Sequence, residues 1–183
     1  KRYAELVSSG KNGKIESVPR SYVVIPSSFG KSLGDNHHRD ILLNLLGVKF
    51  ILNKNESLRE KNEPDYLAFP QEEYSLIYQK PPWQIYKNND ALPRFFLTDS
   101  FVIEKDKEKI ISRLYDYKRD AKTVIFEEDL NIPIQKGKGK IKLIKYSPNK
   151  ISFSVDTQSN NILFMSDNFF PGWKAYVGER ETK

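Results

Sequence analysis

The sequence predicts an α+β chain: a small mixed α/β portion (residues 1–80), followed by an antiparallel β-sandwich-like portion (residues 81–183) that contains one helix (106–118). Two observations carry this prediction. Apolar residues recur at helical spacing in two segments, and they alternate with polar residues in several others. The 183 residues fit one domain or a pair of small ones, and the 10 Tyr, 11 Phe and 2 Trp can supply a core, so most of the chain is expected to be folded.

Helices are predicted in three places. Residues 1–9 form a short helix that ends at the turn signal Gly10, and Asp35 or Asn36 caps a second helix that ends at Gly47. The third helix, 106–118, carries an acidic residue in its first turn and basic residues at its end, which suits the helix dipole. Apolar stripes predict one buried face on each of the two longer helices: Ile41, Leu42, Leu45 and Leu46, then Ile110, Ile111, Leu114 and Tyr115.

Strands are predicted on both sides of the division near residue 80. A β-prone run at 21–25 is followed by the short apolar strand Val48–Leu52. Glu73–Gln79 and Trp83–Lys87 are separated by Pro81-Pro82, which cannot lie in a central strand. Residues 93–103 form a longer β-prone run.

The residue pattern in the last third of the sequence predicts an antiparallel meander. Its strands are Ile141–Tyr146, Ile151–Val155, Ile162–Met165 and Trp173–Val177, with a turn at Ser147-Pro148-Asn149-Lys150. The second of these strands alternates apolar and polar residues, which indicates one buried and one wet face. The third is apolar on both faces, so we expect it to lie centrally in the sheet.

The composition limits the chemistry. With no Cys, the chain holds no disulfide, Cys-based zinc site or thiol nucleophile. No apolar run approaches the roughly 18 residues of a membrane span. The net charge of +6 has one source, because the segment between Asp129 and Asp156 holds no acidic residue and six lysines, while the rest of the chain has 24 basic and 24 acidic residues.

The lysine-rich segment is the first candidate binding site, through Lys138, Lys140 and Lys142. As a regular strand it places Lys140, Lys142 and Ile144 on one side and Ile141, Leu143 and Lys145 on the other. The simplest interpretation is an edge strand whose lysines discourage aggregation. The functional interpretation is contact with an anionic partner: phospholipid headgroups, a polyanionic wall polymer or nucleic acid.

A second candidate site lies in the segment from Asn168 to Lys174. Trp173 fills the core in the simpler interpretation, or stacks on a sugar ring beside Asp167 and Asn168 in the functional one. The adjacent His37 and His38 point about 100° apart in a helix, so they do not predict a metal site. No catalytic residue, metal or cofactor is predicted.

Four segments, taken in order, resemble the extracytoplasmic C-terminal region of the bacterial YfhO family, large polytopic membrane proteins grouped with the GT-C-type lipid-dependent glycosyltransferases. They are residues 42–52 (LLNLLGVKFIL), 85–94 (IYKNNDALPR), 146–151 (YSPNKI) and 166–177 (SDNFFPGWKAYV). The chain departs from the family pattern after Val177, where Gly178-Glu179 stands in place of Asp-Gly. It also stops at Lys183, before the further strands of the family, so the β portion is expected to be truncated.

The resemblance implies where the protein is located in the cell, but it assigns no catalytic reaction to these residues. The acidic catalytic residues of GT-C enzymes lie in early loops that have no counterpart here, so the fragment is expected to be non-catalytic and to help hold an acceptor. Its parent would be a lipid-linked-sugar glycosyltransferase or an envelope-polymer modification protein, on the extracytoplasmic side of the cell membrane. The expected partners are the rest of that parent and a membrane surface or an anionic envelope polymer or glycan, not nucleic acid.

Two other classes stay open from the sequence. A secreted carbohydrate-binding β-sandwich module with no catalytic role would use the same aromatic segment. A nucleic-acid-binding protein would show a basic face that extends beyond the lysine run and binding that weakens steeply with salt.

Overall fold

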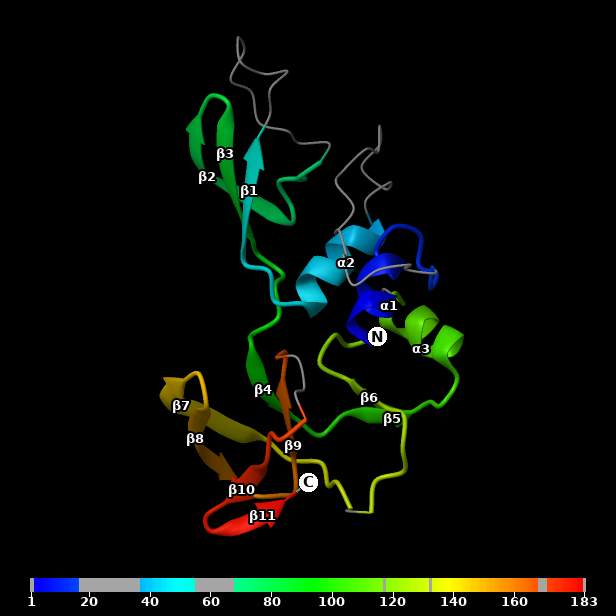
Figure 1. Ribbon diagram of the computed structural model, residues 1–183, viewed down its shortest axis with the longest axis vertical. Coiled ribbons are helices and arrows are strands. Elements are labelled where there is room, and N and C mark those ends of the chain that lie inside the picture. Colours follow the sequence, from blue (N-terminus) through cyan, green and yellow to red (C-terminus); the bar gives the residue numbers. More distant parts are fainter. Residues whose placement is uncertain are drawn as a thin grey trace.

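The computed structural model describes residues 2–16, 37–54, 68–116, 118–131, 133–167 and 171–182. About 17% of the described residues are in helices and 39% are in strands, which form several small and mostly antiparallel sheets. This confirms the predicted α+β, mostly β class. The molecule is elongated, with a three-stranded sheet at one end, the helices beside its middle and β-hairpins at the other end (Figure 1).

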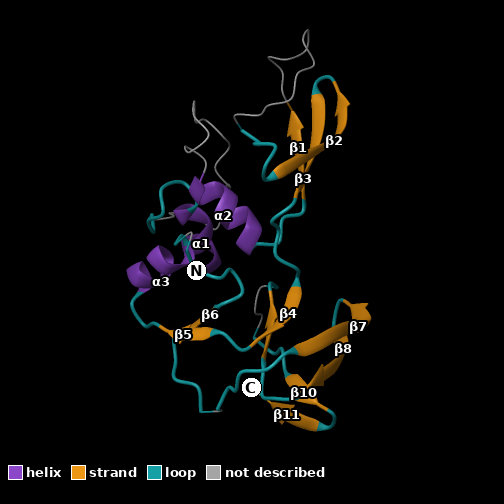
Figure 2. Cartoon of the chain, turned by 180° about the vertical axis from the view of Figure 1, so that it is seen from behind, coloured by secondary structure: helices purple, strands orange, loops and turns teal. Residues whose placement is uncertain are grey.

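Three helices pack against one another. They are α1 (Arg2–Ser9), α2 (His37–Leu45) and α3 (Lys107–Leu114). Their shared core consists of Val7, Leu42, Ile111 and Tyr115, all at most 7% exposed. Figure 2 shows the three helices grouped on one side of the chain. The buried faces predicted for the second and third helices therefore meet in one cluster.

The helix ends follow local chemistry. Gly47 closes α2 at φ +66°, and the amide of Val48 donates to the Leu43 carbonyl at 2.9 Å, so the predicted glycine stop is confirmed. The predicted caps Asp35 and Asn36, like the predicted strand at 21–25, lie outside the described residues. Asp106 caps α3 by accepting from the Lys109 amide at 2.9 Å.

Helix α3 is shorter than predicted, because it ends at Leu114 and not at residue 118. Tyr115 leaves the helical conformation and places its hydroxyl 2.9 Å from Ser9 Oγ, with which it shares a buried hydrogen bond. Asp116 then accepts from the Lys118 amide, a local turn that competes with helix. A tertiary contact and a turn therefore override the helical pattern of the last four residues.

The largest sheet has the order β1-β3-β2 and is antiparallel throughout. Its strands are β1 (Phe50–Lys54), β2 (Tyr74–Lys80) and β3 (Trp83–Asn88), with Pro81-Pro82 in the turn as predicted. One face covers a second core, formed by Ala68, Phe69, Tyr74 and Tyr86. The division drawn near residue 80 lies in the turn between β2 and β3, inside this sheet.

The second portion is not uniformly antiparallel. β5 (Phe101–Ile103) and β6 (Val124–Phe126) pair in parallel, with α3 in the connection between them. A parallel pair needs a long crossover, which the segment containing α3 provides. β4 (Phe95–Thr98) pairs antiparallel with β9 (Ile162–Met165).

The predicted meander is wrong in its connections. β7 (Gly139–Ser147) and β8 (Lys150–Thr157) form a hairpin with the predicted turn, and β10 (Ala175–Val177) and β11 (Arg180–Thr182) form a separate one. β9 pairs with β4 and not with β8, because Phe164 stacks on Phe96 at 4.9 Å between ring centres. The expected central position of β9 is therefore wrong as well, since this sheet has two strands.

Candidate anion-binding face

The register of the β7–β8 hairpin decides which lysines share a face. Lys140 pairs with Asp156 and Lys142 with Ser154, but the register shifts between Leu143 and Lys145. This irregularity is a β-bulge at Ile144, so the three residues of β7 after it change sides relative to a regular strand. Lys145 pairs with Ser152 and thus joins Lys140 and Lys142 on one face.

The predicted division of this strand is therefore wrong for Lys145, which was expected on the side opposite Lys140 and Lys142. Ile144, expected beside those two lysines, has no cross-strand partner in the register. The bulge gathers four lysines on one face, because Lys150 opposite Ser147 also lies there. We call this surface the basic face: Lys140, Lys142, Lys145, Ser147, Lys150, Ser152, Ser154 and Asp156.

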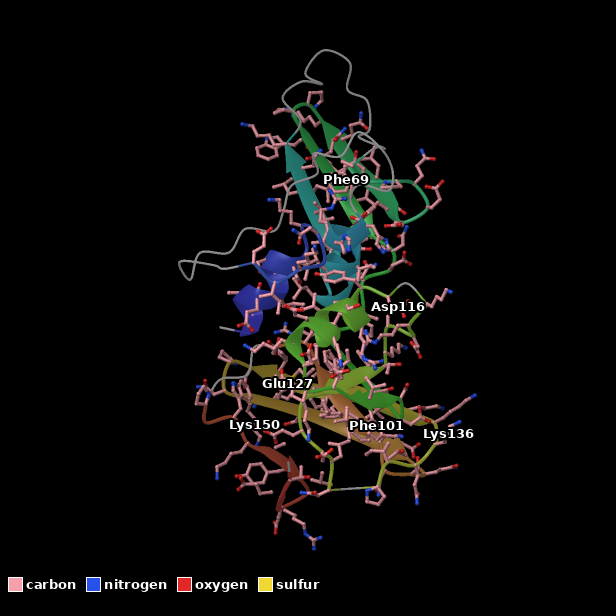
Figure 3. The ribbon with its side chains drawn as sticks, turned by 90° about the vertical axis from the view of Figure 1, so that its right-hand side faces the viewer. Phe69, Phe101, Asp116, Glu127, Lys136 and Lys150 are labelled. Carbon is pink, nitrogen blue, oxygen red and sulfur yellow. The ribbon has the colours of Figure 1, made fainter. Side chains whose placement is uncertain are left out.

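The lysines of the basic face are exposed and outnumber its acidic residues four to one. All four side chains are exposed, and none of the ion pairs within the described part of the chain involves them. Asp156 is the single acidic residue of the face. In Figure 3, Lys150 at the start of β8 and Lys136, three residues before β7, lie on opposite sides of the view. The hairpin therefore presents a row of positive charge to solvent.

The opposite face of the hairpin fixes its position. It consists of apolar and aromatic residues: Ile141, Leu143, Tyr146, Ile151, Phe153 and Val155. The Phe153 ring meets Phe95 of β4 edge-on at 4.9 Å. The guanidinium of Arg94, just before β4, lies 4.7 Å from the centre of the Tyr146 ring. Because this face is turned to β4, the basic face is turned to solvent.

The chain enters β7 through two anchored glycines. The amide of Gly137 donates to Asp99 Oδ2 at 2.9 Å. A Cβ added at Gly139 would lie 2.7 Å from Leu97 Cδ1 and 2.9 Å from Asn161 Oδ1, so a larger residue here would have to displace the ends of these side chains. Lys138 lies between them with its side chain exposed, immediately before the basic face.

Asp167, a predicted binding residue, is engaged in a tether. Its Oδ1 accepts from Arg94 Nε at 2.9 Å and from Nη2 at 2.6 Å, and the same Nη2 donates to the Tyr146 hydroxyl. The hydrogen bond from Arg94 to Asp167 raises the pKa of the guanidinium. Asp167 therefore links the end of β9 to β4 and β7. Arg94 and Tyr146 were missed as its partners, although both belong to segments singled out from the sequence.

The four segments singled out above form one chain of contacts. Asn44 of the first segment accepts from the Leu92 amide through its carbonyl at 3.0 Å and from Asn88 Nδ2 through its side chain at 2.7 Å. The carbonyl of Arg94 accepts from the Ser166 amide at 2.9 Å. Together with the contacts of Arg94 to Tyr146 and Asp167, these bonds bring residues from all four segments into one region.

Trp173 lies apart from these sites. It is 38% exposed and precedes β10, so the interpretation as a core residue within that strand is wrong. No described contact joins it to Asp167 or to the lysines, and Asn168 lies outside the described residues.

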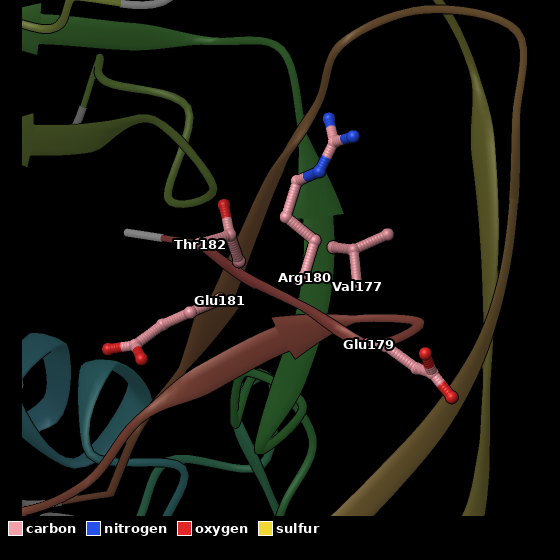
Figure 4. Close-up of a pocket in the computed structure, with 5 residues that line it drawn as sticks. All are labelled: Val177, Glu179, Arg180, Glu181 and Thr182. Atoms are coloured by element: carbon pink, nitrogen blue, oxygen red, sulfur yellow. The ribbon is translucent and has the colours of Figure 1, made fainter.

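A shallow pocket on the adjoining hairpin is lined by Val177, Glu179, Arg180, Glu181 and Thr182. Figure 4 shows the carboxylates of Glu179 and Glu181 pointing to opposite sides, so these side chains do not converge on a ligand.

A second polar cluster is buried between α2 and β2. Asp40 Oδ1 accepts from Arg39 Nη2 at 2.6 Å and from the Tyr74 hydroxyl at 2.8 Å, and Arg39 also donates to the Ala68 carbonyl. Burial, followed by the charge of Asp40, raises the pKa of Tyr74 far above its usual range. The polar groups of Arg39, Asp40 and Tyr74 are hydrogen-bonded within this cluster, so its role is to join α2 to β2.

The described residues hold no group of three His, Asp or Glu side chains that could bind a metal ion. None of the described helices has the length and apolar character to cross a membrane. The described residues do include a β-hairpin with four exposed lysines on one face. No protein-family model matches the chain, and neither a curated protein nor a solved structure is found to be similar to it.

Proposed function

We propose that this chain is a non-catalytic extracytoplasmic domain of a polytopic bacterial membrane protein, and that its basic face holds an anionic envelope polymer. In this proposal the parent is a lipid-linked-sugar glycosyltransferase or an envelope-polymer modification protein, and the domain assists binding of the acceptor. The observation that carries the proposal is the basic face, with four exposed lysines in a row opposite a face turned to β4.

The spacing of the lysines favours a linear polyanion. Lys140 and Lys142 are two residues apart on a strand, which is about 6.5–7 Å along its axis. Successive ammonium groups can therefore contact successive anionic groups of an extended chain. A single small anion would engage one or two of them and leave the others unused.

The composition of the basic face separates this partner from two others. Single-stranded nucleic acid is bound on aromatic side chains that stack with bases, and neutral glycans also pack on aromatic rings. The basic face carries Lys, Ser and Asp alone, and the nearby Tyr146 lies on the opposite face. Charge is therefore the property that this surface offers to a ligand.

The resemblance supports the assignment of the parent. The segments that carry it are far apart in the sequence, yet they meet through Asn44, Asn88, Arg94, Tyr146 and Asp167. Residues that tie a fold together are expected to recur as a set among proteins that share it. Hydrophobic spans of about 20 residues in the gene beyond this chain would be the direct sign of a polytopic parent.

Binding to a poly(glycerol phosphate) polymer tests the role of the basic face. The triple variant Lys140→Gln, Lys142→Gln, Lys145→Gln should bind about 100-fold more weakly at low salt, because each lysine near an anionic surface contributes about 1 kcal/mol. The matched control is Lys11→Gln, Lys14→Gln, Lys109→Gln, which removes the same charge from exposed positions near the helices and should change binding less than about twofold. Calorimetry or fluorescence anisotropy at two salt concentrations measures both.

Other results would contradict this function. Equal losses in the two triple variants would mean that net charge alone drives binding. No binding at low salt would return the lysines to the role of protecting an edge strand. Binding of a neutral polysaccharide that Trp173→Ala abolishes would support the second candidate, a carbohydrate-binding module, which the exposure of Trp173 favours.

A further inference from the structure

The sheet β1-β3-β2 has an outer face that lies opposite its core. In the register of the strands, nine residues occupy this face in three rows across the sheet. The rows are Phe50–Lys87–Ser75, Leu52–Ile85–Tyr78 and Lys54–Trp83–Lys80. We call these nine residues the outer face.

The outer face is apolar and exposed. Phe50 is 56% exposed, Leu52 63%, Tyr78 46% and Trp83 40%. On the inner face of the same central strand, Tyr86 is only 1% exposed. The sheet is thus packed on one side and carries large apolar side chains on the other, at one end of the molecule (Figure 1). Contiguous exposed apolar surface of this kind marks an interaction site.

Every charge on the outer face is positive. Lys54, Lys80 and Lys87 lie in the two outer rows, and the middle row is Leu52, Ile85 and Tyr78. The Lys54 ammonium lies 5.8 Å from the centre of the Trp83 ring, and that of Lys49 lies 5.9 Å from the centre of the Phe50 ring. None of the nine residues is acidic. The surface therefore has an apolar centre with basic groups on both sides.

We propose that the outer face docks on the surface of an anionic phospholipid bilayer. The middle row would enter the boundary between headgroups and acyl chains, where the amphipathic rings of Tyr78 and Trp83 are favoured. The lysine stems lie along the apolar side chains while their ammonium groups reach the lipid phosphates. Positive charge beside apolar surface is the pattern that complements such a membrane.

Other partners fit this surface less well. Leu52 and Ile85 at its centre cannot stack on bases, as a single-stranded nucleic-acid site requires. A glycan site needs polar groups to orient sugar hydroxyls, and Ser75 is the only uncharged polar residue of the face other than Tyr78 and the Trp83 ring nitrogen. The proposal does not rest on the basic face, because the two surfaces belong to different sheets.

Vesicle binding by the 183-residue chain tests the proposal. In a Trp173→Phe background, Trp83 is the only tryptophan, and its emission should shift to shorter wavelength with vesicles of 70% phosphatidylcholine and 30% phosphatidylglycerol. The double variant Phe50→Ser, Leu52→Ser should lower the partition coefficient at least tenfold in cosedimentation. Lys80→Gln, Lys87→Gln should lower it on anionic vesicles, with little change on vesicles of phosphatidylcholine alone.

The matched control is Lys11→Gln, Lys14→Gln, which removes the same charge as the Lys80 and Lys87 variant from exposed positions near the helices and should bind vesicles within about threefold of the parent chain. The substituted side chains are exposed, and circular dichroism verifies that each variant is folded. The proposal is overturned if the chain does not bind anionic vesicles, or if the triple variant Lys140→Gln, Lys142→Gln, Lys145→Gln loses binding while the Phe50 and Leu52 variant keeps it. A dimer in sedimentation analysis that the Phe50 and Leu52 variant dissociates would identify a second copy as the occupant and also overturn it.

Discussion

Two clusters of the same three residue types hold opposite parts of this molecule. Arg39, Asp40 and Tyr74 join α2 to the three-stranded sheet, with the Arg and Asp side chains 5% and 8% exposed. Arg94, Asp167 and Tyr146 join β4, β9 and β7, and there the Arg and Asp side chains are 51% and 24% exposed. The chemistry is the same, so burial decides what each cluster contributes.

The difference extends to the whole chain. Among the described residues, none after Tyr115 is buried, whereas both core clusters lie at or before that residue. The helices and the three-stranded sheet are held by cores. The later hairpins are two-stranded and depend on ladder hydrogen bonds, ring contacts and the Arg94 tether. The basic face is thus displayed by the more lightly packed part of the molecule.

The largest difference in stability between the two regions is expected when the aspartate of each cluster is replaced. Asp40→Ala leaves the buried Arg39 without its carboxylate and should lower the free energy of unfolding by about 3–5 kcal/mol. Asp167→Ala breaks an exposed pair and should cost about 1 kcal/mol or less. Urea unfolding measures both. Similar losses in the two variants would show that burial does not distinguish the clusters.

A truncated leucine in each region gives the next largest difference. Leu42 is fully buried among the helices, so Leu42→Ala should cost about 2–5 kcal/mol. Leu143 in β7 is 37% exposed, and Leu143→Ala should cost less than about 1.5 kcal/mol. The same denaturation experiment compares them. A larger loss at Leu143 would mean that the hairpin contributes a core of its own.

The smallest effect concerns pH and the helical region alone. Burial, followed by the charge of His37, lowers the pKa of His38, whose ring packs edge-on against Tyr115. Below the ordinary value of 6.5 the unfolded chain therefore binds a proton at His38 more readily than the folded chain, and stability falls as the pH is lowered. The Tm should decrease slightly from pH 7.5 to 5.5, and His38→Gln should reduce this decrease. An unchanged decrease in that variant would assign it to other groups.

Much of the fold follows from local patterns in the sequence. The stripe of Ile41, Leu42, Leu45 and Leu46, the stop at Gly47 and the turn at Pro81-Pro82 each depend on residues close together in the chain. The position of the excess positive charge, between Asp129 and Asp156, also follows from the sequence, because counting residues needs no structure. These features depend on periodicity and backbone preference, which act over a few residues.

The partners of each strand and the composition of the basic face were decided by the tertiary structure. A single bulge at Ile144 moved Lys145 onto the face of Lys140 and Lys142. The sequence carries one local sign of it, because the apolar residues Leu143 and Ile144 interrupt the alternation there. Phe96 of β4 stacks on Phe164 of β9, and Arg94 pairs with Asp167, which lies seventy-three positions later in the chain. Pattern fixes which segments become strands, but long-range packing selects their neighbours and register, and register decides which side chains share a surface.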